Sequence, residues 1–134
     1  MRLTTLILGL MLSIMAQANT SPLKVAFVYV STVGDAGWSR SHEDARVYLE
    51  KTFGKNIETT FVENVPVGKE ARKVFDRLAQ EGQDVIFATS YGYMVSSQRV
   101  ASMYPNVKFE HATGLRRGDN LSTYGTRAYE ARYL

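Results

Sequence analysis

The segment Val33–Arg46, with the sequence VGDAGWSRSHEDAR, holds the residues that are best suited to bind a small molecule. It contains Asp35 and Trp38, the only tryptophan of the chain, shortly after an apolar run. An indole ring provides a flat face on which a heterocyclic base can stack, and a carboxylate accepts hydrogen bonds from hydroxyl or amine groups. Each residue also has a structural interpretation, Trp38 as part of the core and Asp35 as a cap of the turn or of the following helix. The residue types alone leave both interpretations open.

A second group of candidate residues begins at Ser90, in the segment SYGYM. Tyr91 and Tyr93 flank a glycine in this segment, and each tyrosine has a ring face and a hydroxyl group that can contact a ligand. We expect Tyr91 to line a cleft and Tyr93 to pack beneath the helix that follows. Ser90 and His111, which ends a later apolar segment, complete the residues of this group that we expect at a ligand site.

The sequence lacks the motifs of common catalytic and cofactor-binding sites. Its first glycine-containing loop has only Gly34 and Gly37, so it matches neither the G-x-G-x-x-G dinucleotide motif nor a P-loop. The chain has no cysteine, SHEDA is not the zinc-binding H-E-x-x-H motif, and no G-x-S-x-G nucleophile motif is present. We therefore expect neither catalysis nor a metal nor a cofactor. A flavodoxin-like or Rossmann-like enzyme, the alternative from another class, would need phosphate-binding chemistry in this loop.

Strands and helices alternate along the rest of the chain. Lys24–Val30 is a continuous apolar run, typical of a strand buried on both faces of a parallel sheet. Gly68–Glu81 has apolar residues at the spacing of an amphipathic helix. Further strands are expected at 57–63, 84–89, 107–110 and 121–126, and further helices at 39–53, at 94–104 and from about residue 127 onward. This alternation predicts an α/β fold with a parallel, doubly wound sheet.

The expected topology places the candidate residues at one edge of the sheet. In open parallel sheets, ligands bind beyond the carboxyl ends of the strands. The loops that follow those ends are 31–38, 89–93 and 111–118. Trp38 and Tyr91 are therefore expected on the same rim, although they are far apart in the sequence.

The N-terminal residues 1–18 have the pattern of a secretory signal peptide. Arg2 precedes the apolar run LTTLILGLMLSIM, and Ala16–Ala18, with the sequence AQA, has the small-x-small pattern of a cleavage site. The run is shorter than the roughly 20 residues of a transmembrane helix, which disfavours a membrane anchor. We expect cleavage after Ala18, which leaves residues 19–134 as the exported chain. Because no cysteine is present for lipid attachment, the sequence predicts a soluble periplasmic protein.

The charge pattern disfavours a nucleic-acid partner. The chain has a formal net charge of +3, with 16 basic and 13 acidic residues. These charges are mixed along the sequence, whereas a nucleic-acid surface shows basic residues clustered in a stripe. We interpret the basic residues as a solvated surface.

Several of these segments, in this order, resemble the N-terminal part of the basic membrane protein family. They are KVAFVYVSTVGDAGWSRSHEDAR, FVENVP, DVIFATSYGYM, YPNVKFEHATG and DNLSTYGTRAYEARYL. The family comprises substrate-binding proteins of ABC importers similar to the purine nucleoside receptor. The resemblance implies a type I periplasmic binding protein, whose two α/β lobes close on a small molecule and deliver it to a membrane permease and its ATPase.

The same resemblance carries expectations for individual residues and for the length of the protein. It implies that Asp35 and Trp38 contribute to the ligand site, with Trp38 stacking on a base. Ser39, which stands where many relatives carry Asn or Thr, is also expected at the ligand site. A purine nucleoside is the expected ligand, and a sugar or riboflavin is the alternative within this fold. Relatives are more than twice as long, so residues 19–134 are expected to form a truncated N-terminal lobe.

Overall fold

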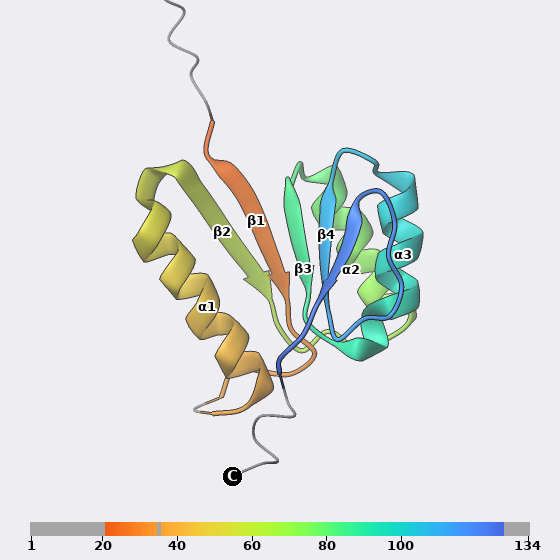
Figure 1. Ribbon diagram of the computed structural model, residues 1–134, viewed down its shortest axis with the longest axis horizontal. Coiled ribbons are helices and arrows are strands. Elements are labelled where there is room, and N and C mark those ends of the chain that lie inside the picture. The colour runs from red at the N-terminus through yellow and green to blue at the C-terminus, as the bar shows by residue number, and fades with distance from the viewer. Residues whose placement is uncertain (1–20, 35, 128–134) are drawn as a thin grey trace, which may run out of the picture.

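The computed structural model describes residues 21–34 and 36–127. Five parallel strands form one sheet in the order β2-β1-β3-β4-β5 (Figure 1). The strands are β1 (Leu23–Val28), β2 (Ile57–Val62), β3 (Val85–Ala88), β4 (Lys108–Ala112) and β5 (Leu121–Tyr124). Strand β1 lies between β2 and β3, so the chain reverses its direction of travel across the sheet after β2.

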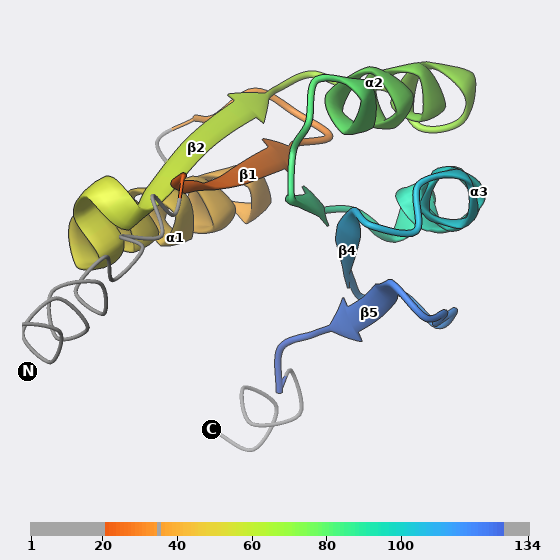
Figure 2. The same ribbon diagram turned by 90° about the horizontal axis from the view of Figure 1, so that it is seen from above.

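The helices cover both faces of the sheet. They are α1 (Trp38–Phe53), α2 (Lys69–Gln80) and α3 (Met94–Met103), with short 3₁₀ turns η1 (Gly54–Asn56) and η2 (Tyr91–Tyr93). Helix α1 lies on one face, while α2 and α3 lie together on the other (Figure 2). The predicted α/β fold with a parallel, doubly wound sheet is therefore confirmed. Within the described residues, none of the helices has the length and apolar character that crossing a membrane requires.

The larger core lies between the sheet and the helices α2 and α3. Phe75 of α2 is fully buried, and its ring meets Tyr93 at 5.3 Å and Phe109 at 6.0 Å in edge-to-face geometry. Offset and edge-to-face contacts of this kind add to the free energy gained by burying the rings. A smaller cluster contains Phe27 and Phe87, whose rings stack at a centroid distance of 4.6 Å.

The element boundaries differ from the sequence predictions by a few residues. Strand β1 ends at Val28, two residues before the expected end. The Tyr29 N–H still donates to the carbonyl of Val62, the last residue of β2, but the Tyr29 carbonyl accepts from the Val65 N–H in the loop beyond β2. Strand β4 extends to Ala112, because its last residues pair with β5. Helix α1 begins at Trp38 itself. The expected signal peptide, and all but the first residue of the helix expected from about 127, lie outside the described residues.

The large core predicts a stability test. We expect Phe75→Ala to lower the free energy of unfolding by about 3–5 kcal/mol, because it removes a fully buried ring and leaves a cavity. Phe53→Ala, at a side chain that is 50% exposed, is the matched control and should cost much less. Urea unfolding followed by circular dichroism measures both. Equal losses would show that the ring of Phe75 is not the centre of this core.

Candidate ligand-binding site

Trp38 connects the loop that follows β1 to the loop that follows β3, at the edge where the parallel strands end. It is the first residue of α1, and Gly37 before it adopts a positive φ of 100°, which glycine accommodates without strain. The indole Nε1 donates a hydrogen bond to the carbonyl oxygen of Thr89, directly after β3. The ring is nevertheless 41% exposed. Trp38 is thus fixed in orientation while one part of its surface stays open, as a stacking platform requires.

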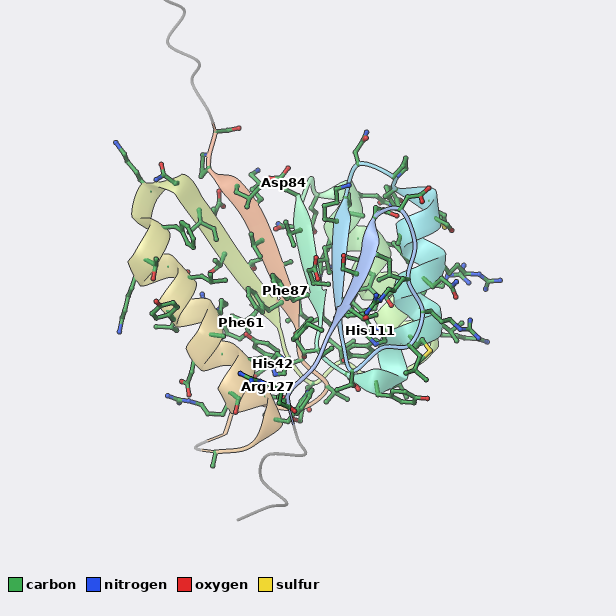
Figure 3. All side chains as sticks on the ribbon, in the orientation of Figure 1. His42, Phe61, Asp84, Phe87, His111 and Arg127 are labelled. Atoms are coloured by element: carbon green, nitrogen blue, oxygen red, sulfur yellow. The ribbon has the colours of Figure 1, made fainter. Side chains whose placement is uncertain are left out.

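His42 and Tyr124 extend the aromatic surface beside Trp38. The His42 ring lies one helical turn after Trp38, at a centroid distance of 4.8 Å, and it lies 6.1 Å from the Tyr124 ring on β5. Figure 3 shows His42 and His111 toward the edge where the strands end, opposite Asp84. The sequence prediction missed His42 as part of this edge. Its i, i+4 spacing from Trp38 was the available signal.

Ser39 is buried beneath the first loop. Its side chain is 3% exposed, and its Oγ lies 2.7 Å from the Oγ of Ser31. This contact fastens the start of α1 to the loop that follows β1. Asp35, which was predicted to contact the ligand from the same loop, lies outside the described residues.

The loop after β3 presents one tyrosine and buries the other. The Ser90 hydroxyl accepts a hydrogen bond from the Gly92 amide at 3.3 Å and so shapes the turn η2. Tyr91 is 57% exposed, whereas Tyr93 is fully buried and donates a hydrogen bond from its hydroxyl to the Val65 carbonyl at 2.6 Å. Burial also raises the pKa of Tyr93. The expected packing of Tyr93 beneath the helix is confirmed, and Tyr91 is available at the surface.

His111 lies behind this loop, with no exposed surface. Its Nε2 is 2.8 Å from the Ser90 carbonyl oxygen, so Nε2 carries the proton and donates it. Nδ1 is buried and has no hydrogen-bond partner among residues 21–34 and 36–127, and it faces Gly114, where an added Cβ would stand 2.0 Å from it. Burial lowers the pKa of His111, although carbonyl groups of Ser90 and Tyr91 partly oppose that shift. His111 therefore holds the loop in place as a neutral imidazole.

The arrangement is suited to binding. Both histidines direct a ring nitrogen to a backbone carbonyl, His42 to Trp38 and His111 to Ser90, and within the described part of the chain neither is paired with a serine or threonine hydroxyl. Among residues 21–34 and 36–127, no three His, Cys, Asp or Glu side chains gather as metal ligands would. What the edge does provide is a fixed aromatic surface with hydrogen-bonding groups beside it, and small-molecule sites in proteins are built from such groups.

Comparisons with known proteins define the family. Residues 23–134 match the model of the Bmp family, described as ABC transporter substrate-binding protein PnrA-like. The chain belongs to this family. It is 46% identical over 126 residues to a purine-binding protein of Brucella abortus, covering 94% of this chain and 36% of that protein. It is also 41% identical over 112 residues to a Haloferax volcanii protein named as an ABC transporter glucose-binding protein, TsgA13, covering 84% of this chain and 28% of that one.

A solved structure shows the same fold at lower sequence identity. An ABC transporter solute-binding protein from Conexibacter woesei superposes with a TM-score of 0.66 at 18% identity, covering 77% of this chain and 35% of that chain. The chain thus spans about a third of the length of these three proteins. Its resemblance to the N-terminal part of PnrA-like substrate-binding proteins is confirmed.

The environment of His111 predicts a pH dependence of stability. Its pKa in the folded protein lies below the usual 6.5, so folding favours the neutral ring. The resulting stability is complete above pH of about 6.5 and is lost as the pH falls through the lower pKa of the folded state. Urea unfolding between neutral and mildly acidic pH should show this loss in the wild type but not in His111→Gln. His42→Gln is the matched control and should retain the slope. The same slope in all three proteins would contradict this role of His111.

Proposed function

We propose that this protein is the periplasmic binding component of an ABC importer and that it carries a purine nucleoside or a similar flat heterocycle. The ligand stacks on Trp38, while Asp35, Ser90 and Tyr91 contact it with polar groups. Ser39 and His111 act behind them by holding the two loops in position. Binding and release involve no chemical step, and the loaded protein delivers its ligand to the membrane permease and its ATPase.

The exposed but fixed ring of Trp38 is the observation that carries this proposal. A side chain that served only the core would be covered, whereas this ring is 41% exposed at the edge where parallel α/β sheets bind ligands. The 46% identity to a protein named as purine-binding supports a purine among the possible ligands. The relative named as glucose-binding keeps a sugar as the second candidate, because sugars also pack on indole rings. Riboflavin remains a third candidate of the same chemistry.

The ligand proposal is tested first by calorimetric titration of the protein with adenosine, guanosine, inosine, adenine, riboflavin, ribose and glucose. We expect purine compounds to bind and Trp38→Ala to weaken that binding by about 1–3 kcal/mol, the value typical of stacking on a base. Trp38→Phe is the matched control, since it keeps a stacking ring but removes the indole N–H that bonds to Thr89. Circular dichroism confirms that each variant folds. Binding of glucose or ribose alone would replace the purine with a sugar, and unchanged affinity in Trp38→Ala would remove Trp38 from the site.

We further propose that residues 19–134 form the N-terminal lobe of a two-lobed binding protein. The relatives are about three times as long as the region of them that matches this chain. An apolar groove of about 490 Å³ lies beside α1, lined by side chains that include Leu49, Phe53, Val85, Phe87 and Tyr124. A longer polypeptide would cover this groove with its own apolar side chains, because burying such a surface is favourable.

Coverage of the groove can be tested by thiol labelling, because residues 1–134 contain no cysteine that would react in place of an introduced one. We introduce Phe53→Cys in the groove and Tyr48→Cys on the same helix, where the side chain is 67% exposed. In the natural protein as the cell exports it, we expect maleimide to react much more slowly at position 53 than at position 48. In residues 19–134 produced alone, both positions should react readily. Equal rates in the natural protein would show that no part of it covers the groove.

A further inference from the structure

A hollow of about 400 Å³ lies between the start of α2 and the start of α3 and is not part of the candidate ligand site. Val67 and Val95 form its apolar part, and both are more than half exposed. Lys69, Arg72 and Arg99 also line it, and none of the described residues that line it is acidic. We call this set of five residues the basic surface.

The three cations of the basic surface have no partner within the described residues. Other exposed cations of α2 are paired, Lys73 with Glu70 at 2.9 Å and Arg77 with Glu81 at 3.0 Å. Lys69, Arg72 and Arg99, in contrast, make no ion pair and donate no side-chain hydrogen bond in the part of the chain that the structure describes. Three cations without a partner among the described residues therefore surround one apolar hollow.

The backbone beneath the basic surface is firmly held. The Tyr93 hydroxyl donates to the Val65 carbonyl at 2.6 Å, and the Ser96 hydroxyl donates to the Gly68 carbonyl at 2.9 Å. Gly92 packs so closely on Val67 that an added Cβ would lie 2.5 Å from its Cγ1. These contacts join the segment before α2 to the turn η2, which carries Tyr91. The basic surface is thus preformed, and it adjoins the loop that we assign to the ligand site.

We infer that the basic surface docks the protein onto an acidic surface of its membrane permease, an inference that rests on the proposed function. Carboxylates of the permease pair with Lys69, Arg72 and Arg99, and apolar side chains of the permease pack on Val67 and Val95. A preformed patch with an apolar centre and a charged rim is the usual anatomy of a protein interface. Charges on such a rim mainly raise the association rate and make it depend on salt. Because the surface adjoins Tyr91, docking takes place beside the loaded ligand site.

The test compares two charge reversals of equal size in cells that produce the natural protein. R72E/R99E alters the basic surface, and K51E/K55E alters two exposed lysines at the end of α1 and in η1, which have no partner among the described residues. We expect R72E/R99E to lower ligand uptake about tenfold or more, within the range of electrostatic steering. K51E/K55E should leave uptake near the wild-type level. Raising the ionic strength should reduce uptake by the wild type more than uptake by R72E/R99E.

A photo-crosslinking amino acid at position 95 identifies the partner directly. We expect it to form an adduct with the permease subunit, identified by mass spectrometry, and this adduct should be lost in R72E/R99E but kept in K51E/K55E. Binding to vesicles of anionic phospholipid is measured in parallel. If R72E/R99E loses vesicle binding and the wild type forms no permease adduct, the basic surface binds the membrane. That result would overturn the inference. Unchanged uptake and an unchanged adduct in R72E/R99E would also overturn it.

Calorimetric titration separates failure of this inference from failure of the proposed function. Both charge-reversal variants should bind the purine ligand as the wild type does, because the basic surface lies outside the candidate site. If the wild type binds none of the tested ligands and supports no uptake, the proposed function fails. If ligand binding and uptake are intact and R72E/R99E changes neither uptake nor the adduct, only the docking inference fails.

Discussion

The carbonyl and hydroxyl groups of Thr89 connect the two loops on which the candidate site depends. Thr89 is fully buried, and its hydroxyl donates to the Val28 carbonyl at 2.7 Å, while its own carbonyl accepts the indole N–H of Trp38. This is possible because Val28 and Ala88 are aligned partners in neighbouring parallel strands, so the chain leaves β1 and β3 at the same level. The orientation of the Trp38 ring is thereby set before any ligand arrives. Preorganisation of this kind lowers the entropy cost of binding.

A partly buried polar network holds α1, which begins with Trp38, against the sheet. Arg46 makes two hydrogen bonds to the carboxylate of Glu43, at 2.6 and 2.8 Å, and the Tyr29 hydroxyl donates to the same carboxylate at 2.9 Å. The guanidinium also lies 5.2 Å from the centre of the Phe61 ring on β2. Hydrogen bonding to Arg46 is the main cause that lowers the pKa of Glu43, so the network contains an ionised pair at neutral pH. Charged groups so paired fix the position of a helix even where its apolar contacts are few.

The two faces of the sheet expose different surfaces, an apolar groove on one side and a hollow lined by cations on the other. The face under α2 and α3 has the larger core, and its outer side carries the basic surface around Val67 and Val95. The opposite face is covered by α1 only in part, and the groove beside α1 remains open in the described residues. Our proposals assign these surfaces to the rest of a longer protein and to a permease, besides the edge that we assign to a ligand. The open apolar groove suits the first of these, and the charged, preformed hollow suits the second.

The sequence by itself determined the α/β class, the order of the elements and the edge at which the candidate residues meet. These follow from local patterns, such as the apolar run at Lys24–Val30, and from the geometric rule that parallel strands end at one edge. Tertiary structure decided which side chains of that edge are accessible. Tyr91 and Tyr93 are two residues apart, yet one is exposed and the other is buried, because η2 turns the chain between them. His42 lies at the edge, where its ring is close to that of Tyr124, which is distant in the sequence. Ser39 and His111 lie behind the edge, where Ser39 contacts Ser31 of the preceding loop and His111 contacts the carbonyl of Ser90. Such contacts depend on how the loops pack on one another, and no local pattern of residue types encodes that packing.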